Sequence, residues 1–194
     1  MSDREVDITV LLTLHSETLV AGPTLKSIEA AIAEAEMAGW VVERLIGLDN
    51  PSQPCRDYVD QGAFHNWTIL ETAYADQGRV RNHLAEQAKG RWLAVMDGDD
   101  LCSENWLVEA AALLKSPDGA RAIVHPELNW VFDAGTYVYT NPPSSSNFFS
   151  HSVMSTSNYY DAICVAPREA WLETKYAHRA VKQGFAYEDY QWAV

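Results

Sequence analysis

Three aspartates within four positions, Asp97, Asp99 and Asp100, follow a short apolar run. Like charges this close repel one another, so the cluster needs a stabilising cause, and a bound cation is the usual one. Gly98 lets the backbone bend, so the carboxylates of Asp97 and Asp99 can face one point. Oxygen ligands with open positions suit Mg²⁺ or Mn²⁺, which keep water and share the phosphates of a substrate. The spacing therefore predicts a divalent-cation site with Asp99 and Asp97 as ligands.

Other interpretations of this cluster come from its neighbours in the sequence. Asp99 or Asp100 can instead cap the helix that is expected to follow. A calcium loop of the EF-hand type is excluded, because Cys102 stands where its sharp-turn glycine belongs. A phosphatase-type aspartate nucleophile normally lies after the first strand of its domain, whereas four expected strands precede this cluster. The metal site and the helix cap are therefore the two leading interpretations.

The composition describes a globular chain with a strong negative charge. Its 194 residues are enough for one domain with a sizeable core, and 47% of them are apolar. The formal net charge of −13 argues against non-specific binding of nucleic acid, which needs a basic surface. An anionic small molecule is still compatible with this charge, because a metal ion and a few local cations can reverse the sign at one site.

The cysteines and the N-terminus bear on the cellular compartment. Cys55, Cys102 and Cys164 are far apart and odd in number, so they predict neither a zinc site nor a disulfide framework and fit a reducing cytoplasm. The charged N-terminus MSDREVD lacks the features of a signal peptide. No apolar run approaches the ~18 residues of a membrane span. We therefore expect a cytoplasmic protein without a membrane span in this chain, which can also work at the cytoplasmic face of a membrane.

Strands and helices are expected to alternate up to residue 132. Short apolar runs rich in β-branched residues predict strands, and apolar residues at helical spacing predict helices, one of which Ser103 would cap. This alternation predicts an α/β fold with a mainly parallel sheet and helices on both faces. Ligands gather at the carboxyl ends of such strands, where Asp97 lies. The expected strands cover 8–14, 41–52, 66–73, 91–97 and 120–132, and the expected helices cover 22–40, 79–90 and 103–116.

The pattern changes in the last third of the chain. Residues 136–161 are rich in Ser, Pro, Asn and aromatic residues. Because these aromatics need something to pack on, the segment predicts a long ordered loop with hairpin elements and not a linker. Residues 53–64 predict a short helix or loop, 162–167 a strand and 168–175 a helix. We therefore expect one domain whose smaller C-terminal region is attached to the sheet.

Four segments resemble, in the same order, those of family 2 glycosyltransferases with the GT-A fold. ITVLLTLHSE resembles the family's first strand and the turn under the nucleotide base, and LIGLDNPS resembles its second strand with a final acidic residue. DQGRVRNHLAEQAKGRWLAVMDGDD resembles its block of glycine, Arg-Asn pair, helix, strand and DxD motif. FAYEDYQW resembles its Glu-Asp motif before an aromatic residue. The resemblance spans residues 8–192 and implies a Rossmann-like GT-A fold, a nucleotide-sugar donor and a metal ion.

The resemblance implies roles for three residues on the nucleotide side. Asp49 would accept a hydrogen bond from the base or the ribose, although it can equally be a turn residue. His15 falls where the family often has an aromatic residue that stacks on the base, although a plain surface histidine is equally consistent. Arg81 would neutralise a phosphate or contact the base, or it would pair with Glu86 or with a carboxylate at the end of the sheet.

The resemblance also implies roles for the aspartate cluster. Asp97 would face the ribose, or the metal through water, and Asp99 would bind the metal that bridges the two phosphates. Asp100 is a secondary candidate. Mn²⁺ or Mg²⁺ would act as a Lewis acid that offsets the charge on the leaving nucleoside diphosphate.

Glu188 and Asp189 resemble the family's catalytic Glu-Asp pair. An inverting transfer needs a base that takes the proton from the acceptor hydroxyl, and the resemblance implies Asp189 as this base with Glu188 oriented nearby. An acidic first turn of a helix is the alternative. Trp192 would line the acceptor site or lie in the core. The segment before the pair keeps only Gly184 and Phe185 of the family's usual run, and the chain ends five residues after Asp189, which predicts a truncated form.

We therefore expect a metal-dependent, inverting glycosyltransferase of the hexosyltransferase type. Residues 1–118 would bind the nucleotide sugar, UDP-linked by default. Residues 119–194 would bind the acceptor, a hydroxyl of a glycan, a lipid-linked saccharide or a protein. Two alternatives stay open, a non-catalytic domain that binds a nucleotide sugar or glycan, and a nucleotidyltransferase. The latter is weakened because HSETLVAGPTLK lacks the Gly-rich basic segment of that class.

Overall fold

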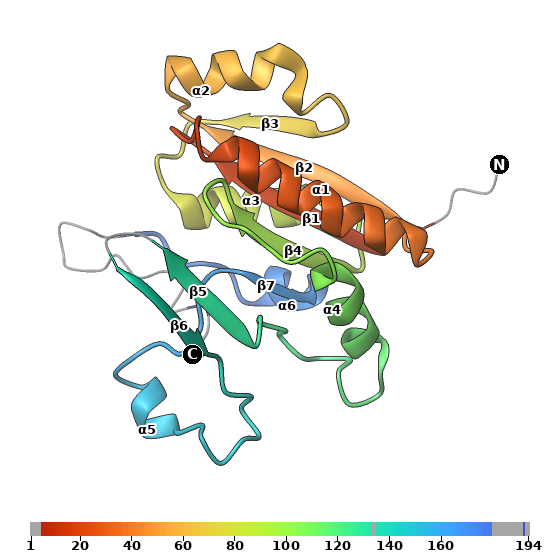
Figure 1. Ribbon diagram of the computed structural model, residues 1–194, viewed down its shortest axis with the longest axis vertical. Coiled ribbons are helices and arrows are strands. Elements are labelled where there is room, and N and C mark those ends of the chain that lie inside the picture. The colour runs from red at the N-terminus through yellow and green to blue at the C-terminus, as the bar shows by residue number, and fades with distance from the viewer. Residues whose placement is uncertain (1–4, 133–134, 180–191, 193–194) are drawn as a thin grey trace.

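A five-stranded sheet forms the centre of the structure, a computed structural model that describes residues 5–132, 135–179 and 192 (Figure 1). Its strands are β1 (Ile8–Leu14), β2 (Val42–Asp49), β3 (Thr68–Thr72), β4 (Trp92–Asp97) and β7 (Cys164–Pro167). They lie in the order β3-β2-β1-β4-β7, with β1 to β4 parallel and β7 antiparallel to β4. All side chains of β1 are buried, as expected of a parallel strand that is covered on both faces.

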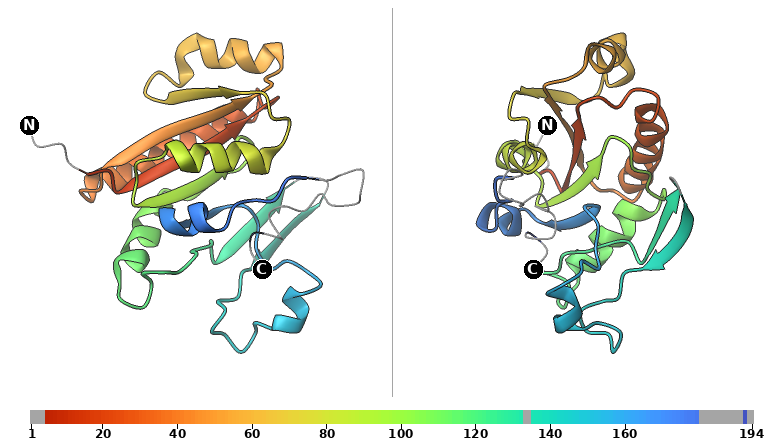
Figure 2. Two further views of the ribbon diagram at one scale, coloured as in Figure 1. Left: turned by 180° about the vertical axis from the view of Figure 1, so that it is seen from behind. Right: turned by 90° about the vertical axis from the view of Figure 1, so that its left-hand side faces the viewer.

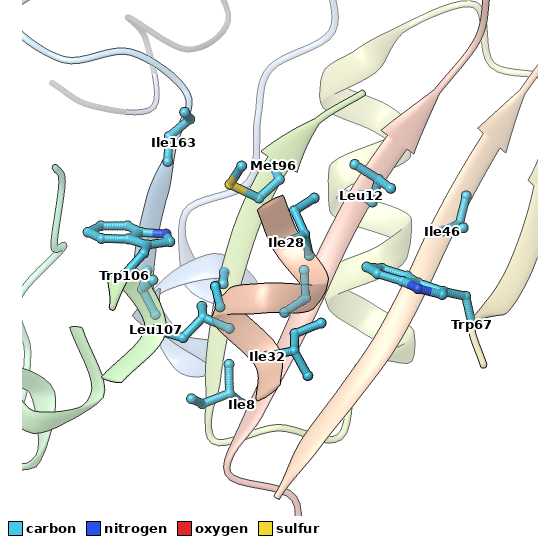
Figure 3. Packing of buried hydrophobic residues seen from close by; sticks show 14 of the residues in the cluster. Ile8, Leu12, Ile28, Ile32, Ile46, Trp67, Met96, Trp106, Leu107 and Ile163 are labelled. Carbon is cyan, nitrogen blue, oxygen red and sulfur yellow. The ribbon is translucent and has the colours of Figure 1, made fainter. Parts of the chain in front are cut away.

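Helices cover both faces of this sheet. The helices are α1 (Ala21–Met37), α2 (Gln53–Tyr58), η1 (Val59–Ala63), α3 (Gln77–Gln87), α4 (Trp106–Lys115), α5 (His151–Met154) and α6 (Arg168–Glu173). α1 and α4 pack on one face, and α3 and α6 pack on the other (Figure 2). On the first face Ile28 and Ile32 of α1 lie over β1, beside Leu107 of α4 (Figure 3). The α/β fold expected from the sequence, with helices on both faces, is confirmed.

The start of α4 differs from the expected capping pattern. The helix begins at Trp106 and follows Asn105, which makes no side-chain capping bond. Ser103 was the expected cap, but its carbonyl oxygen accepts a hydrogen bond from the amide of Trp106 at 3.1 Å, so these residues form a turn before the helix. The prediction of a Ser103 cap is therefore wrong.

The strand expected over residues 120–132 is also wrong as a fifth parallel strand. Val124 makes a single antiparallel bridge to Val165 of β7, and Pro126 then interrupts the pairing because proline has no N–H to donate. The chain continues into a separate antiparallel hairpin of β5 (Leu128–Phe132) and β6 (Thr136–Thr140). The fifth strand of the main sheet is β7, which the sequence did predict.

The β5–β6 hairpin and α5 lie outside the five-stranded sheet, below β4 in Figure 1. Only β6 and α5 lie in the aromatic segment 136–161, for which hairpin elements were expected, because the partner strand β5 precedes it. Trp130 pairs with Val138 across the hairpin, and both side chains are exposed. In the described part of the chain, no helix has the length and apolar character needed to cross a membrane.

Candidate functional site

The carboxyl ends of β1, β2 and β4 meet at one edge of the sheet, where the strand order reverses. The parallel register places Thr13 of β1 opposite Asp97 of β4, and Asp49 ends β2. Ligands of open α/β sheets bind at this kind of edge. The fold therefore brings His15, Asp49 and Asp97, three residues that the sequence singled out, to a common position.

Asp97 is the centre of a polar network at this edge. Its Oδ1 accepts hydrogen bonds from Thr13 Oγ1 at 2.8 Å, from Gln77 Nε2 at 2.8 Å and from Arg81 Nη2 at 2.9 Å. Its Oδ2 lies 2.7 Å from the same Arg81 nitrogen. Side chains from β1 and α3 thus fix the carboxylate in one orientation, with 19% of its side chain exposed.

Arg81 lies fully inside the protein, with 0% of its side chain exposed. Of the partners that the sequence left open for it, the structure shows the carboxylate at the end of the sheet, Asp97. Glu86 pairs instead with Lys175 at 2.6 Å. The guanidinium also lies 5.3 Å from the centre of the Tyr176 ring. Its positive charge therefore offsets the innermost aspartate of the cluster.

Asp99 and Asp100 form the turn that follows β4, with the Asp100 amide donating to the Asp97 carbonyl at 3.2 Å. Gly98 allows this turn, because an added Cβ would lie 2.4 Å from Leu14 Cδ2. Neither aspartate caps α4, which begins several residues later at Trp106. The helix-cap interpretation of the cluster is therefore excluded.

The carboxylates in and beside this turn have raised pKa values. Partial burial, followed by the charge of Asp97, raises the pKa of Asp99. Burial and the charges of Asp97, Asp99 and Asp161 raise the pKa of Asp100 to about 7, and Arg81 only partly counteracts them. Burial likewise raises the pKa of Asp161, which lies before β7. The turn therefore carries an uncompensated negative potential that a cation would relieve.

The donor set fits a magnesium or manganese ion that is shared with a substrate. Within residues 5–132, 135–179 and 192, no group of three or more His, Cys, Asp or Glu side chains converges as a complete metal cage. Mg²⁺ commonly uses only one or two carboxylates together with water and substrate phosphates. Asp99 is exposed on the turn and can supply such a carboxylate.

A first cavity of about 320 Å³ opens beside Asp97 at the ends of β1 and β2. Its walls include Thr13, His15, Asp49, Asp76, Gln77 and Arg179. The ring of His15 donates from Nδ1 to the Asp49 carbonyl at 2.7 Å. Asp49 Oδ1 accepts hydrogen bonds from Thr72 at 2.8 Å and from the Tyr74 amide at 2.7 Å, which fixes the carboxylate at the cavity wall.

Asp76 is a site residue that sequence reasoning missed. It caps α3 by accepting from the Arg79 amide at 3.0 Å, and its other oxygen accepts from His178 Nδ1 at 2.7 Å and from the Arg179 amide at 3.0 Å. Its burial alone would raise the pKa, but these hydrogen bonds outweigh that effect and lower it. An Asp three residues before Arg79 is a helix-cap signal in the sequence. The neighbouring residues do not indicate that the same carboxylate also binds His178 and Arg179.

A second side chain of α3 holds the same C-terminal segment. The Asn82 amide donates to the Tyr176 carbonyl at 2.9 Å and accepts from the Tyr176 amide at 3.0 Å. Together with Asp76, it attaches residues 176–179 to α3 and brings Arg179 to the first cavity. Ala75, with φ of 50°, adopts a left-handed conformation at the same cavity, a strain often found at functional sites.

A second cavity of about 550 Å³ lies on the other side of the aspartate turn. Its walls include Asp99, Asp100, Trp106, Asn129, Trp130 and Asp161. The turn thus separates a cavity at the sheet edge from a cavity beneath the β5–β6 hairpin. Among the described residues, this arrangement can hold an extended ligand with a metal-bound group in the middle.

The expected catalytic pair, Glu188 and Asp189, lies outside the described residues. Trp192 lies in the core, with 6% of its surface exposed. Its ring stacks on Trp171 with centroids 4.1 Å apart, and its Nε1 donates to the Thr174 carbonyl at 2.6 Å. Of the two positions that the sequence allowed for Trp192, the structure shows the buried one.

Comparison with known proteins places this geometry in context. A family model described as glycosyl transferase family 2 matches residues 25–147. No curated protein sequence matches the chain.

Several solved structures share the fold. The crystal structure of S. aureus TarS 1–349 aligns with a TM-score of 0.66 and 15% identity, over 95% of this chain and 55% of that chain. The same TarS fragment in complex with UDP-GlcNAc aligns with a TM-score of 0.65 and 14% identity, over 96% of this chain and 54% of that chain. The mannosyltransferase PcManGT from Pyrobaculum calidifontis, in complex with GDP-Man and Mn²⁺, aligns with a TM-score of 0.52 and 16% identity, over 63% of this chain and 36% of that chain. The chain thus spans about half the length of TarS 1–349.

Proposed function

The chain belongs to glycosyl transferase family 2, and on this premise we propose that it transfers a sugar from a nucleotide-sugar donor to a hydroxyl acceptor. The observation that carries the proposal is the aspartate turn between two cavities. A donor can place its nucleoside in the first cavity, its diphosphate at the turn and its sugar toward the second cavity. UDP is the proposed nucleotide, since TarS has been crystallised with UDP and UDP-GlcNAc.

The first cavity supplies contacts for the nucleoside. His15 offers an imidazole face for the base, and the carboxylate of Asp49 accepts a hydrogen bond from the base or the ribose. Asp97, held by Arg81 and Gln77, accepts from a ribose hydroxyl or from metal-bound water. Because Arg81 is buried in this pair, we assign it the role of positioning Asp97.

Arg179 takes the phosphate-facing role that the sequence analysis gave to Arg81. It is the one arginine or lysine among the described residues that line the first cavity. Asp76 accepts a hydrogen bond from the Arg179 backbone amide, which holds this part of the chain at the cavity wall. Arginine contacts phosphates through strong charge-assisted hydrogen bonds. The acceptor-side half of the chain, residues 119–194, would thus complete the nucleotide site of residues 1–118.

Asp99, with Asp97 through water, would hold Mn²⁺ or Mg²⁺ at the diphosphate. When bound, the ion supplies Lewis-acid stabilisation of the charge that develops on the leaving group. A structure of PcManGT contains Mn²⁺, which supports testing this ion first.

The transfer itself is proposed to invert the anomeric centre of a hexosyl donor. The acceptor oxygen attacks the anomeric carbon while the bond from that carbon to the diphosphate oxygen breaks. The bonding electron pair leaves with the nucleoside diphosphate, and the acceptor proton passes to Asp189, oriented by Glu188. The acceptor is a hydroxyl of a glycan, a lipid-linked saccharide or a protein. The three cysteines are free thiols, which supports a cytoplasmic reaction.

Calorimetric titration with UDP, GDP and dTDP, each with and without Mn²⁺, tests the donor site. We expect UDP binding that requires the metal and falls at least about tenfold in Asp99→Ala, the loss of one charge-assisted contact. Asp118→Ala removes an exposed aspartate elsewhere and serves as the matched control. Absence of metal-dependent binding to all three nucleotides would contradict the proposal.

Turnover separates an enzyme from a binding domain. Hydrolysis or transfer of the UDP-sugar should fall about 10²–10⁴-fold in Asp189→Asn, as for loss of a general base, while UDP affinity stays near that of the wild type. UDP binding without turnover in the wild type would instead favour a non-catalytic nucleotide-sugar-binding domain.

A further inference from the structure

The walls of the second cavity have an unusual charge composition. Asp99, Asp100 and Asp161 contribute carboxylates, and none of the described residues that line the cavity is Lys, Arg or His. Asp99 would be engaged by the metal, and the charges of that ion and of a donor diphosphate largely offset each other. Asp100 and Asp161 would then still give the cavity a negative potential, so it disfavours ligands with phosphate, sulfate or carboxylate groups.

Hydrogen bonds hold the polar wall of this cavity in place. Asn129 Nδ2 donates to the Tyr139 hydroxyl at 3.1 Å, and that hydroxyl donates to Asp161 Oδ2 at 3.3 Å. The Ile163 amide donates to Asp161 Oδ1 at 3.1 Å. The β5–β6 hairpin is thus linked to the start of β7, and the Asp161 carboxylate is fixed at the wall as an acceptor for ligand hydroxyls.

Two tryptophans line the second cavity. Trp130 lines the cavity with 66% of its surface exposed, which is unusual for so large an apolar side chain. Trp106 lines the cavity from α4 with only 8% exposed, and its buried Nε1 has no hydrogen-bond partner among the described residues. Trp130 is therefore the aromatic side chain that a ligand in this cavity can reach most freely.

These properties match the surface of a neutral sugar ring. A pyranose presents hydroxyl groups, which donate to fixed carboxylates, and an apolar C–H face, which packs on an aromatic ring. We propose that the second cavity binds the acceptor as an uncharged saccharide and excludes acceptors whose reacting unit carries an anionic group. The inference rests on the proposed glycosyl transfer for the identity of this ligand as the acceptor.

Fluorescence titration of the metal-loaded protein in the presence of UDP tests the binding step directly. The probes are lactose, cellobiose and di-N-acetylchitobiose, each compared with a disaccharide that contains glucuronic acid. We expect at least one neutral disaccharide to change the tryptophan fluorescence saturably, with at least tenfold tighter binding than the anionic one. Trp130→Ala should weaken that binding about 2–10-fold, the range expected for loss of an aromatic stacking contact. The matched control is Phe148→Ala, which truncates an exposed aromatic residue outside the cavity and should leave binding unchanged.

The outcomes separate this inference from the proposed function. Equal or tighter binding of the anionic disaccharide, or neutral binding that Trp130→Ala leaves unchanged, overturns the inference. Metal-dependent UDP binding without a response to any neutral disaccharide also overturns it, while the donor site stands. If UDP itself fails to bind, the proposed function fails. The same titration without nucleotide then tests by itself whether the cavity binds a neutral saccharide.

Discussion

Replacement of Arg81 by methionine tests whether the buried pair at the end of β4 is a structural support of the site. Methionine keeps much of the length of the side chain but removes the only positive charge within hydrogen-bond distance of Asp97 among the described residues. Loss of one partner from a buried ion pair typically costs about 3–5 kcal/mol of folding free energy. Asp97 keeps its bonds from Thr13 and Gln77, so we expect about 3 kcal/mol.

This loss of folding free energy can be measured by urea titration and by thermal melting. For a chain of this size, about 3 kcal/mol corresponds to a decrease in Tm of roughly 6–12 °C. Arg79→Met is the matched control, because Arg79 is exposed on the same helix and its guanidinium lies over the Tyr74 ring. That control should cost less than about 1 kcal/mol.

A double-mutant cycle measures the interaction energy between Arg81 and Asp97. Asp97→Asn removes the negative charge that pairs with the buried guanidinium of Arg81, so it should also destabilise the protein. Combining Arg81→Met with Asp97→Asn should cost at least about 2 kcal/mol less than the sum of the single changes. Additive effects within about 0.5 kcal/mol, or a loss below about 1 kcal/mol in Arg81→Met, would refute the assignment of Arg81 as the charge partner of Asp97.

Three further predictions concern charge, pH and packing around the site. Arg179→Gln should weaken metal-dependent UDP binding about 10–100-fold, whereas Arg79→Gln should not, and calorimetry with equal losses in both would exclude a specific contact. Burial lowers the pKa of His125 from 6.5 to about 4, so the stability it confers is present above pH 6.5 and is lost as the pH falls through 4. Urea titrations should show at most about 3.4 kcal/mol of this loss between those pH values. An unchanged pH dependence in His125→Asn would contradict His125 as its source. Gly98→Ala should shift the aspartate turn, because the added Cβ would lie 2.4 Å from Leu14 Cδ2. UDP affinity at constant Mn²⁺ should therefore fall. An unchanged affinity would show that the turn tolerates the shift.

The parts of the fold that follow from local chemistry could be predicted from the sequence. The run ITVLLTL is rich in apolar and β-branched residues, and it forms the fully buried β1. The strand over 120–132 could not be assigned correctly, because one apolar pattern covers a single bridge at Val124 and the separate strand β5. Pro126 marks the break, but a proline alone does not show that the chain leaves the sheet for a hairpin.

The site could be predicted in its position but not in its charge pairing. The position of Asp97 at a strand end follows from the preceding apolar run. The choice of Asp97 as partner of Arg81 depends on which face of α3 packs against the sheet, and spacing alone leaves several acidic partners open. Contacts of Asp76 and Asn82 with residues 176–179 connect positions about a hundred residues apart, so no local pattern contains them.

The distribution of charge around the turn explains why we expect donor binding to depend on a metal ion. Burial raises the pKa of Asp99, Asp100 and Asp161, and the charge of Asp97 raises each of them further. The positive charge of Arg81 is already paired with Asp97. A diphosphate brought to this turn would meet each ionised carboxylate at a cost of roughly 3 kcal/mol at 5 Å and an effective dielectric constant of 20. Arg179 can offset one such interaction but not several. A divalent cation between the carboxylates and the phosphates changes the sign of these interactions, so nucleotide affinity should increase with Mn²⁺ far more than with an equal ionic strength of NaCl. A nucleotide that bound equally well in EDTA would show that the diphosphate lies away from the turn.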